Sequence, residues 1–317
     1  MTRSSVVTLG ETMALVRTTE IGSLRHASEL RFGIGGAESN VAIGLARLGI
    51  AVSWLGRIGD DSLGERVARE IRGEGVDVRA VIDADAPTGL MVKEKPSVSS
   101  TAVHYYRAGS AGSRLSASDV PEGWVEEATL LHVTGITPLL SQAARGAVHT
   151  AVDRAKAAGV TVSFDINYRS ALGAAAVAGP LLREIAERAD IVFGGAEEFG
   201  ILYPGASPRE AARLLQEAGC ATVVVKLGPD GAAVHTGVEV VSSPGFAIDV
   251  VDTVGAGDAF VAGYLNVLLD GADLDTVLRR ANACGAMACL VPGDWEAAPT
   301  LRELERFLLG DADPVRR

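Results

Sequence analysis

The chain has 317 residues, of which 48% are hydrophobic and 22% are charged, and it carries a formal net charge of −11. This composition suits one large globular domain over residues 1–317 and excludes a disordered chain. The negative charge argues against a nucleic-acid partner, because phosphate backbones are held by clustered Lys and Arg.

The apolar runs are too short to cross a bilayer, and the first of them is followed at once by Glu11, unlike a signal peptide. We therefore expect a cytoplasmic protein without a membrane partner. The cysteines lack metal spacing and the histidines form no HExxH pair, so buried structural thiols are expected.

Apolar runs alternate with helical patterns through most of the chain. This alternation predicts an α/β fold with a mainly parallel sheet covered by helices on both faces, whose ligands gather at the carboxyl ends of the strands. The predicted strands are Val6 to Leu9, Ala51 to Leu55, Thr129 to Val133, Val160 to Phe164, Ile191 to Phe193 and Thr222 to Leu227. The clearest helices are Ser39 to Leu48, Leu63 to Glu74, Gln142 to Ala158 and Pro208 to Ala218.

The first glycine motif is GIGGAESNVAIGLARLG, from Gly33 to Gly49. Gly35 and Gly36 allow a chain reversal or a close approach to a ligand, and Ser39 or Asn40 can cap the helix that follows. A dinucleotide-binding fold is not favoured, because the GxGxxG spacing and the strand before it are missing.

Two segments, about 11–32 and 88–107, interrupt the alternation. Both are rich in strand formers and neither contains a convincing helix, so we expect separate β-structure there. One interpretation is a peripheral β-ribbon that serves as a dimer contact, because exposed edge strands pair readily.

Two arginines stand at strand ends, each after a tyrosine. In YYRAGSAGS, strand alternation sends Tyr105 and Arg107 to one face and Tyr106 to the other. Arg169 closes DINYR, from Asp165, at the end of a buried strand. Singly, each arginine is most simply a surface charge. Together they favour a grip on an anionic ligand, because a carboxylate accepts a bidentate Arg.

The strongest motif is GAGD, residues 255–258, at the start of an amphipathic helix. Gly255, Ala256 and Gly257 put three backbone amides there with almost no side chain in the way, so an anion can approach the main chain. Asp258 is then placed to accept a proton from a hydroxyl that attacks a phosphoryl group. Alternatively, Asp258 is only a first-turn acid favoured by the helix dipole, and the glycines serve helix packing.

The whole string DTVGAGDAFVAGYL closely resembles the C-terminal signature of the PfkB, or ribokinase-like, carbohydrate kinases, and Gly33 to Gly49 resembles their N-terminal signature. The resemblance implies a three-layer ribokinase-like fold in which segments 11–32 and 88–107 form a small β-sheet lid over the sugar. A lid suits a kinase because it keeps water from the phosphoryl group. Carried over, Asp258 is the catalytic base, the amides of residues 255–257 form an anion hole, and Gly35, Gly36 and Asn40 line the sugar site.

YYRxGSAGS, HVTGITPxLS from His132 to Ser141 and DxNYR together resemble one branch of this family, the 2-keto-3-deoxygluconate kinases. This implies a sugar acid phosphorylated at a terminal hydroxyl, giving the 6-phosphate. The substrate-binding residues carried over are Gly36, Tyr105, Arg107, Ile136, Arg169 and Asp294. On the nucleotide side, KLGPDG looks like the family's ATP turn, which implies ATP contacts from Lys226, Gly228, Gly231 and Asn282; no P-loop motif is present.

The chain departs from the family pattern at three positions. Gly195 stands where an Asn serves metal and phosphate, although Glu198 keeps the acid expected to face the metal. Met91 replaces a lid Tyr, which puts one substrate hydrogen bond in doubt. Ala297 replaces a Gly near the C-terminus, so the local backbone is in question.

The resemblance thus implies an ATP- and Mg²⁺-dependent sugar-acid kinase, with a monovalent cation such as K⁺ left open, that pairs as a homodimer or higher homo-oligomer. Two rival hypotheses remain. One is a kinase of a neutral sugar such as fructose or ribose, and the other is a non-catalytic sugar or nucleotide sensor.

Overall fold

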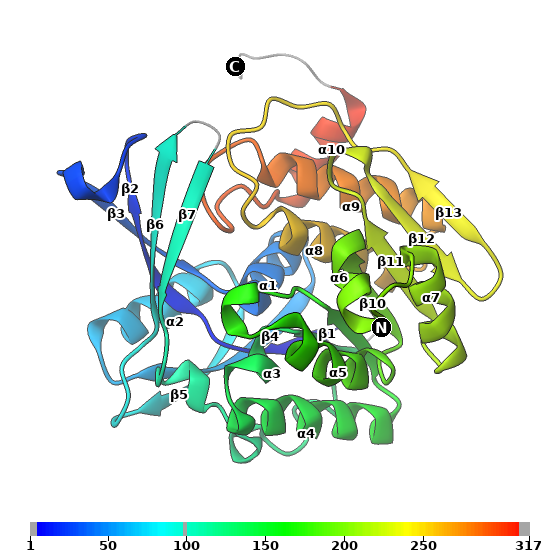
Figure 1. Ribbon diagram of the computed structural model, residues 1–317, viewed down its shortest axis with the longest axis horizontal. Helices are drawn as coiled ribbons and strands as arrows, with labels where there is room; N and C mark the ends of the chain where they lie inside the picture. Colours follow the sequence, from blue (N-terminus) through cyan, green and yellow to red (C-terminus); the bar gives the residue numbers. More distant parts are fainter. Residues whose placement is uncertain (1–4, 98–99, 311–317) are drawn as a thin grey trace.

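The structure is a computed structural model that describes residues 5–97 and 100–310. Within these residues, a nine-stranded sheet runs in the order β13-β12-β11-β10-β9-β8-β1-β4-β5 (Figure 1). The strands from β11 to β5 are parallel, whereas β12 and β13 are antiparallel additions at one edge. Their bounds are β1 (Ser5–Leu9), β4 (Ala51–Gly59), β5 (Asp77–Asp83), β8 (Leu130–Thr134), β9 (Thr161–Asp165), β10 (Ile191–Gly195), β11 (Thr222–Lys226), β12 (Ala232–Thr236) and β13 (Val240–Ser243).

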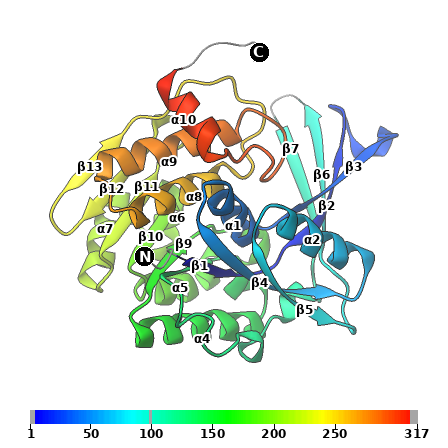
Figure 2. The same cartoon turned by 180° about the vertical axis from the view of Figure 1, so that it is seen from behind.

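Helices cover both faces of this sheet, because successive strand residues point to opposite sides. Val6 of β1 belongs to one apolar core and Val7 to the other. The first core packs against α1 (Ala37–Arg47), α2 (Ser62–Gly73), α8 (Ala256–Leu269) and α9 (Leu274–Ala288). The second packs against α4 (Gln142–Ala158), α5 (Ala175–Ala186), α6 (Ala196–Leu202) and α7 (Pro208–Glu217). Figures 1 and 2 show α8 and α9 on one side of the sheet and α4 and α5 on the other.

The predicted strands and helices are confirmed, with ends that shift by up to four residues. One local prediction is wrong: α1 begins at Ala37 with Gly36 as its N-cap, so neither Ser39 nor Asn40 caps it. The strands β5, β12 and β13 carried no strong pattern of their own. The structure also has the short α3 (Thr137–Leu140) and the C-terminal α10 (Leu301–Leu309).

A separate four-stranded sheet, the small sheet, forms from the two segments that interrupt the alternation. Its described strands lie in the order β3-β2-β6-β7, with β2 (Met13–Thr18), β3 (Leu30–Gly35), β6 (Leu90–Ser97) and β7 (Ser100–Tyr106). It stands to one side of the large sheet, beside the connection that leads from β13 to α8 (Figure 1). The expected small sheet is therefore present.

Helices α1 and α8 pack very closely. A Cβ added at Gly44 of α1 would lie 2.7 Å from the Cβ of Ala262 of α8, so only glycine permits this approach. The N-termini of both helices lie at the same end of the sheet, because Asn40 near the start of α1 bonds Asp258 near the start of α8. The cysteines are free and buried, as expected. In the described part of the chain, no helix is long and apolar enough to span a membrane.

Tyr264 tests how α8 is held against the sheet. Its ring meets Phe193 edge-on at 5.0 Å between centroids, while its buried hydroxyl has no hydrogen-bond partner among the described residues. We expect Tyr264→Phe to leave the free energy of unfolding unchanged or raise it by up to about 1 kcal/mol, because an unpaired buried hydroxyl stabilises nothing. Tyr264→Leu should lower it by about 1–3 kcal/mol, because the ring contacts are lost. Urea unfolding of the two variants checks both; a large loss in Tyr264→Phe would contradict the assignment.

Candidate active site

A cavity of about 380 Å³ opens between the small sheet and the carboxyl ends of the parallel strands. Its lining includes most of the predicted site residues, namely Gly35, Gly36, Asn40, Tyr105, Arg107, Ile136, Arg169, Glu198, Lys226, Gly255, Gly257, Asp258 and Asp294. Ala256, Gly228, Gly231 and Asn282 are not among the described residues that line it. Residues spread over most of the sequence are thus brought to one place.

The N-terminus of α8 forms the floor of the cavity on one side. Gly255 has a left-handed backbone, with φ +77°, and a Cβ there would lie 1.8 Å from the carbonyl oxygen of Asp294. Both facts require glycine at this position. The amides of Gly255, Ala256 and Gly257 start the helix, where backbone N–H groups lack helical partners and the dipole favours an anion.

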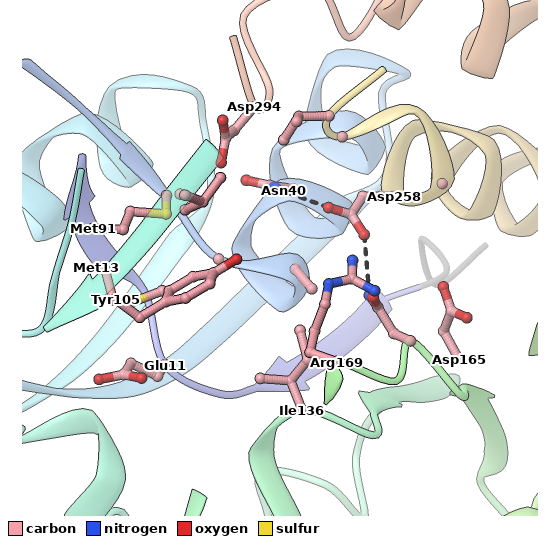
Figure 3. A pocket seen from close by; sticks show the side chains of 18 of the residues that line it. Glu11, Met13, Asn40, Met91, Tyr105, Ile136, Asp165, Arg169, Asp258 and Asp294 are labelled. Atoms are coloured by element: carbon pink, nitrogen blue, oxygen red, sulfur yellow. Dashed lines mark hydrogen bonds between the residues drawn. The ribbon is translucent and has the colours of Figure 1, made fainter. Parts of the chain in front are cut away.

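Asp258 lies in the first turn of α8, 8% exposed and facing the cavity (Figure 3). Asn40 Nδ2 donates a hydrogen bond of 2.8 Å to its Oδ2, and Asn167 Nδ2 donates one of 3.4 Å to its Oδ1. Burial raises the pKa of Asp258 to about 7; the Asn40 hydrogen bond opposes this, the Asp165 charge adds to it, and the Arg169 and Lys226 charges oppose it. The carboxylate is therefore oriented and poised to accept a proton near neutral pH.

Asn167 was not singled out by the sequence analysis, although it lies within DINYR. It is the only non-glycine residue with a left-handed backbone in the described part of the chain, with φ +38°. Asn tolerates this region better than most residues, and its side chain reaches Asp258 as a result. An Asn directly after a strand end is the signal that points to it.

Tyr105 and Arg107 share a face, as strand alternation predicted. The Arg107 guanidinium lies 5.7 Å from the centroid of the Tyr105 ring, and both line the cavity. Arg107 is already paired: its Nε donates to Glu11 Oε2 at 2.7 Å, and its Nη2 lies 2.5 Å from the same oxygen. The guanidinium still has N–H groups free for a ligand, because only two of its five donors face Glu11.

Glu11 lines the cavity, although the sequence analysis did not single it out as a site residue. It is buried, its Oε1 accepts a hydrogen bond from Ser110 Oγ, and a Cβ at Gly112 would lie 2.2 Å from its Cγ. Gly89 closes the other side, where a Cβ would lie 2.6 Å from Glu11 Oε1. The signal was an acid placed just after an apolar strand end.

Arg169 extends into the cavity toward Asp258 (Figure 3). Its Nη1 donates to the Tyr168 carbonyl at 3.1 Å. Among the described residues that line the cavity, it is the only cation without an ion pair, since Lys93, Arg107 and Lys226 are all paired. Arg169 is therefore the positive charge most available to an incoming anion.

Lys226 ends β11 inside the cavity. Its Nζ donates to both carboxylate oxygens of Asp165, each at 2.8 Å, and a Cβ at Gly257 would lie 3.6 Å from it. Burial alone would lower the Lys226 pKa, but Asp165, Glu198 and Asp258 outweigh it and raise that pKa. The Lys226 ammonium thus lies inside the cavity beside the N-terminus of α8, and not at the cavity rim.

Both oxygens of Glu198 accept backbone hydrogen bonds, from Tyr168 N at 2.8 Å and from Gly195 N at 2.7 Å. Glu198 thereby caps α6 and fixes the loop after β9. No cluster of three or more His, Cys, Asp or Glu able to hold a metal occurs within residues 5–97 and 100–310. The Glu198 carboxylate therefore suits a Mg²⁺ ion that keeps most of its water and has few direct ligands from the protein.

The two other departures from the family pattern have simple structural outcomes. Met91 packs with Met13 and Leu15 and pairs in register with Tyr105, so an apolar wall faces the cavity where a hydroxyl was expected. Ala297 does not adopt a left-handed backbone, so glycine is not required at this position. Its turn is held by Arg47, whose Nη1 donates to the carbonyls of residues 295, 296 and 298.

The remaining predicted nucleotide residues gather away from the cavity lining. Asn282 Nδ2 donates to the carbonyls of Ser243 and Pro244, at 3.1 and 3.2 Å. A Cβ at Gly231 would lie 2.1 Å from the same Ser243 oxygen, and Gly228 precedes it in the β11–β12 turn. Asn282 and Gly231 thus meet the same segment, residues 243–245, which begins at the end of the edge strand β13.

Comparisons with known proteins agree with this geometry. Residues 3–301 match the family model described as pfkB family carbohydrate kinase. A 2-dehydro-3-deoxygluconokinase of Bacillus subtilis is 39% identical over 95% of this chain and 94% of its own length, and a 2-dehydro-3-deoxygalactonokinase of Haloferax volcanii is 34% identical over 97% of each. A putative ribokinase II of E. coli, solved with ATP and Mg²⁺, superposes with a TM-score of 0.90 at 27% identity, over 97% of this chain and 99% of its own. The ribokinase-like fold is confirmed.

The raised pKa of Asp258 predicts a stability difference that depends on pH. Because its folded-state pKa, about 7, exceeds the ordinary value of 3.8, the folded protein binds this proton more tightly. The wild type should lose stability relative to Asp258→Asn as pH rises from about 4 to about 7, by at most about 1.4 kcal/mol for each pH unit. Urea unfolding without ligands, at several pH values, measures the difference. Asp270→Asn, at the exposed end of α8, is the control, and a flat difference for Asp258→Asn would contradict the shift.

Proposed function

Because this chain belongs to the pfkB family of carbohydrate kinases, we propose that it transfers the ATP γ-phosphoryl group to the 6-hydroxyl of 2-keto-3-deoxygluconate. This sugar acid is the same compound as 2-dehydro-3-deoxygluconate. The observation that carries the proposal is that one cavity has Asp258 on the α8 side and Tyr105 of the small sheet opposite it (Figure 3), with Arg107 directly after β7 beside the Tyr105 ring. One end supplies a base and the other a grip for a carboxylate.

In the proposed reaction, the 6-hydroxyl oxygen forms a bond to the γ-phosphorus while the bond from phosphorus to the β,γ-bridging oxygen breaks. ADP leaves with that electron pair, and Asp258 Oδ takes the hydroxyl proton. A carboxylate with a pKa of about 7 is still too weak to make a free alkoxide, so proton transfer accompanies bond making. Asn40 and Asn167 keep the carboxylate aimed during this step.

Charge on the transferred phosphoryl group is met by three features of the chain. The amides of residues 255–257 lie at the N-terminus of α8, where those of Gly255 and Gly257 line the cavity and that of Ala256 already donates to the Thr253 carbonyl at 3.3 Å. Arg169 brings a guanidinium without an ion pair among the described residues beside Asp258, and Lys226 keeps one ammonium N–H beyond its bonds to Asp165. Such preorganised donors are worth about 3 kcal/mol each in comparable sites. Arg169 therefore belongs to the phosphoryl side in this proposal, and Arg107 to the carboxylate side.

ATP would bring Mg²⁺ with it, and the ion would supply charge neutralisation on the phosphate oxygens. Glu198 faces this region through its remaining lone pairs, so its contact is proposed to run through water. Gly228, Gly231 and Asn282 are proposed to shape the nucleotide side of the site, from the β11–β12 turn and from α9.

A neutral sugar remains the second candidate acceptor for a specific reason. Glu11 already balances the charge of Arg107, so the cavity does not require a second carboxylate for neutrality. The apolar wall of Met13 and Met91 also suits a deoxy carbon or a hydroxymethyl group equally well. We set the non-catalytic sensor aside for two reasons. The chain belongs to the carbohydrate kinases, and it keeps Asp258 together with the Asn40 side-chain amide that holds it.

A homodimer through the small sheet forms part of the proposal. Strand β3 is an edge of that sheet, and it exposes the apolar side chains of Leu30 and Phe32. Paired edges of this kind bury main-chain groups that otherwise invite aggregation.

Asp258→Asn should bind both substrates but lose turnover by about 10²- to 10⁴-fold, because its amide accepts no proton. In the wild type, kcat/KM should rise with pH until about 7 and then level off, as Asp258 ionises. A coupled ADP-release assay over pH 5–9 measures both quantities. Turnover in the variant within threefold of the wild type would remove Asp258 from the role of base.

Arg107→Ala should raise KM for 2-keto-3-deoxygluconate by about 10- to 100-fold, the cost of a charged hydrogen-bond pair, and leave fructose and ribose unaffected. The variant Glu11→Gln with Arg107→Met repeats the test without leaving a buried charge alone. Arg31→Ala, an exposed arginine of β3, is the control. Equal losses for acidic and neutral sugars would favour the neutral-sugar kinase.

A further inference from the structure

A buried lysine outside the sequence motifs joins three separate parts of the chain. Lys93 of β6 lines the cavity, and its side chain is only 8% exposed. Its Nζ lies 2.7 Å from Asp252 Oδ2 and 3.5 Å from Asp294 Oδ1. Asp252 stands in the connection that leads into α8, and Asp294 follows α9. The small sheet is therefore tied by charge to both segments that border the anion hole.

The two carboxylates need a cation at this position. Their side chains are 9% and 8% exposed, and burial raises the pKa of Asp294 to about 6, while the Lys93 charge opposes that rise. A buried carboxylate that loses its only counter-ion is strongly destabilising. Lys93 is the only cation within ion-pair distance of Asp252 and Asp294 in the described residues.

These carboxylates border the anion hole from two sides. Asp252 Oδ1 accepts a hydrogen bond of 3.2 Å from Val254 N, one residue before Gly255. The main chain of Asp294 packs against Gly255, where any Cβ would strike its carbonyl oxygen. A shift of either segment would therefore move the amides of residues 255–257.

We propose that Lys93 is a positioning residue of the kinase, whose ammonium holds Asp252 and Asp294 together and so fixes the anion hole relative to the small sheet. The proposal rests on the proposed role of the amides of residues 255–257 toward phosphoryl charge. A displacement of about 1 Å in such a group costs about 100-fold in rate. Because the amides act mainly on charge that builds in the transition state, the effect falls on kcat more than on the KM for ATP.

The test compares Lys93→Met, Asp252→Asn and the double variant. Asp252→Asn keeps an Oδ1 acceptor for Val254 N but removes the charge that Lys93 balances. We expect Lys93→Met to lower kcat by about 10- to 100-fold, with the KM for ATP within about threefold of wild type. The double variant should recover at least about fivefold in kcat over Lys93→Met, because only Asp294 is then left without its counter-ion, and burial already favours its neutral form.

Amide hydrogen exchange of residues 251–257 gives a second readout that needs no substrate. Exchange should be faster in Lys93→Met and slower again in the double variant. Lys95→Met is the matched control, because Lys95 lies two residues along β6 and its Nζ donates to the Val251 carbonyl at 2.9 Å, away from any carboxylate. It should stay within about twofold of wild-type kcat, as expected for an exposed contact.

Unchanged kcat and unchanged exchange in Lys93→Met would overturn the proposal, and so would a double variant no more active than Lys93→Met. If Lys93→Met does not fold, the triple variant that adds both Asp252→Asn and Asp294→Asn decides: a folded triple variant supports the counter-ion role and an unfolded one overturns it. Turnover is measured with the sugar that the wild type phosphorylates best. An error in the sugar-acid assignment would therefore change the substrate of the assay and leave the hydrogen-exchange result untouched.

Discussion

The rest of the structure depends on burying one carboxylate, that of Asp258, where a second anion must also bind. Neutral amides of Asn40 and Asn167 hold it, so the carboxylate is oriented without a bound cation that would hold its pKa low. The close contact of α1 with α8 at Gly44 brings Asn40 within reach of Asp258. The hydrogen bond from Asn40 of α1 to Asp258 of α8 therefore links the packing of the two helices to the chemistry of the site.

The protein has a net charge of −11, and most of the cations that line its cavity are paired with carboxylates. Arg107 faces Glu11, Lys226 faces Asp165, and Lys93 faces Asp252, while Arg169 has no ion pair among the residues that the structure describes. In the proposed reaction, most of the attraction for phosphate then comes from backbone amides and one arginine, close to where charge develops. This local arrangement leaves the global charge free to serve solubility.

The sequence predicted the layers, the small sheet and most of the cavity lining, because apolar periodicity and glycine-rich turns are local signals. Asn40 shows where local signals stop: the same residue suits a helix cap or an inward contact, and a partner 218 residues away decides. Glu11 and Lys93 went unnoticed because each acts on a partner that is distant in the sequence. Asn282 lies on α9, and no local pattern in the sequence indicates that its side chain bonds the end of β13.

The long sequence separation between α1 and α8 also matters while the chain is being synthesised on the ribosome. Helix α1 emerges early, yet the helix that covers its apolar face, α8, is synthesised more than two hundred residues later. Until then the nascent chain carries an uncovered hydrophobic stripe, of the kind that chaperones recognise. Contacts of such long sequence separation also slow folding, so the last quarter of the chain, rather than its first strand, sets when the molecule becomes active.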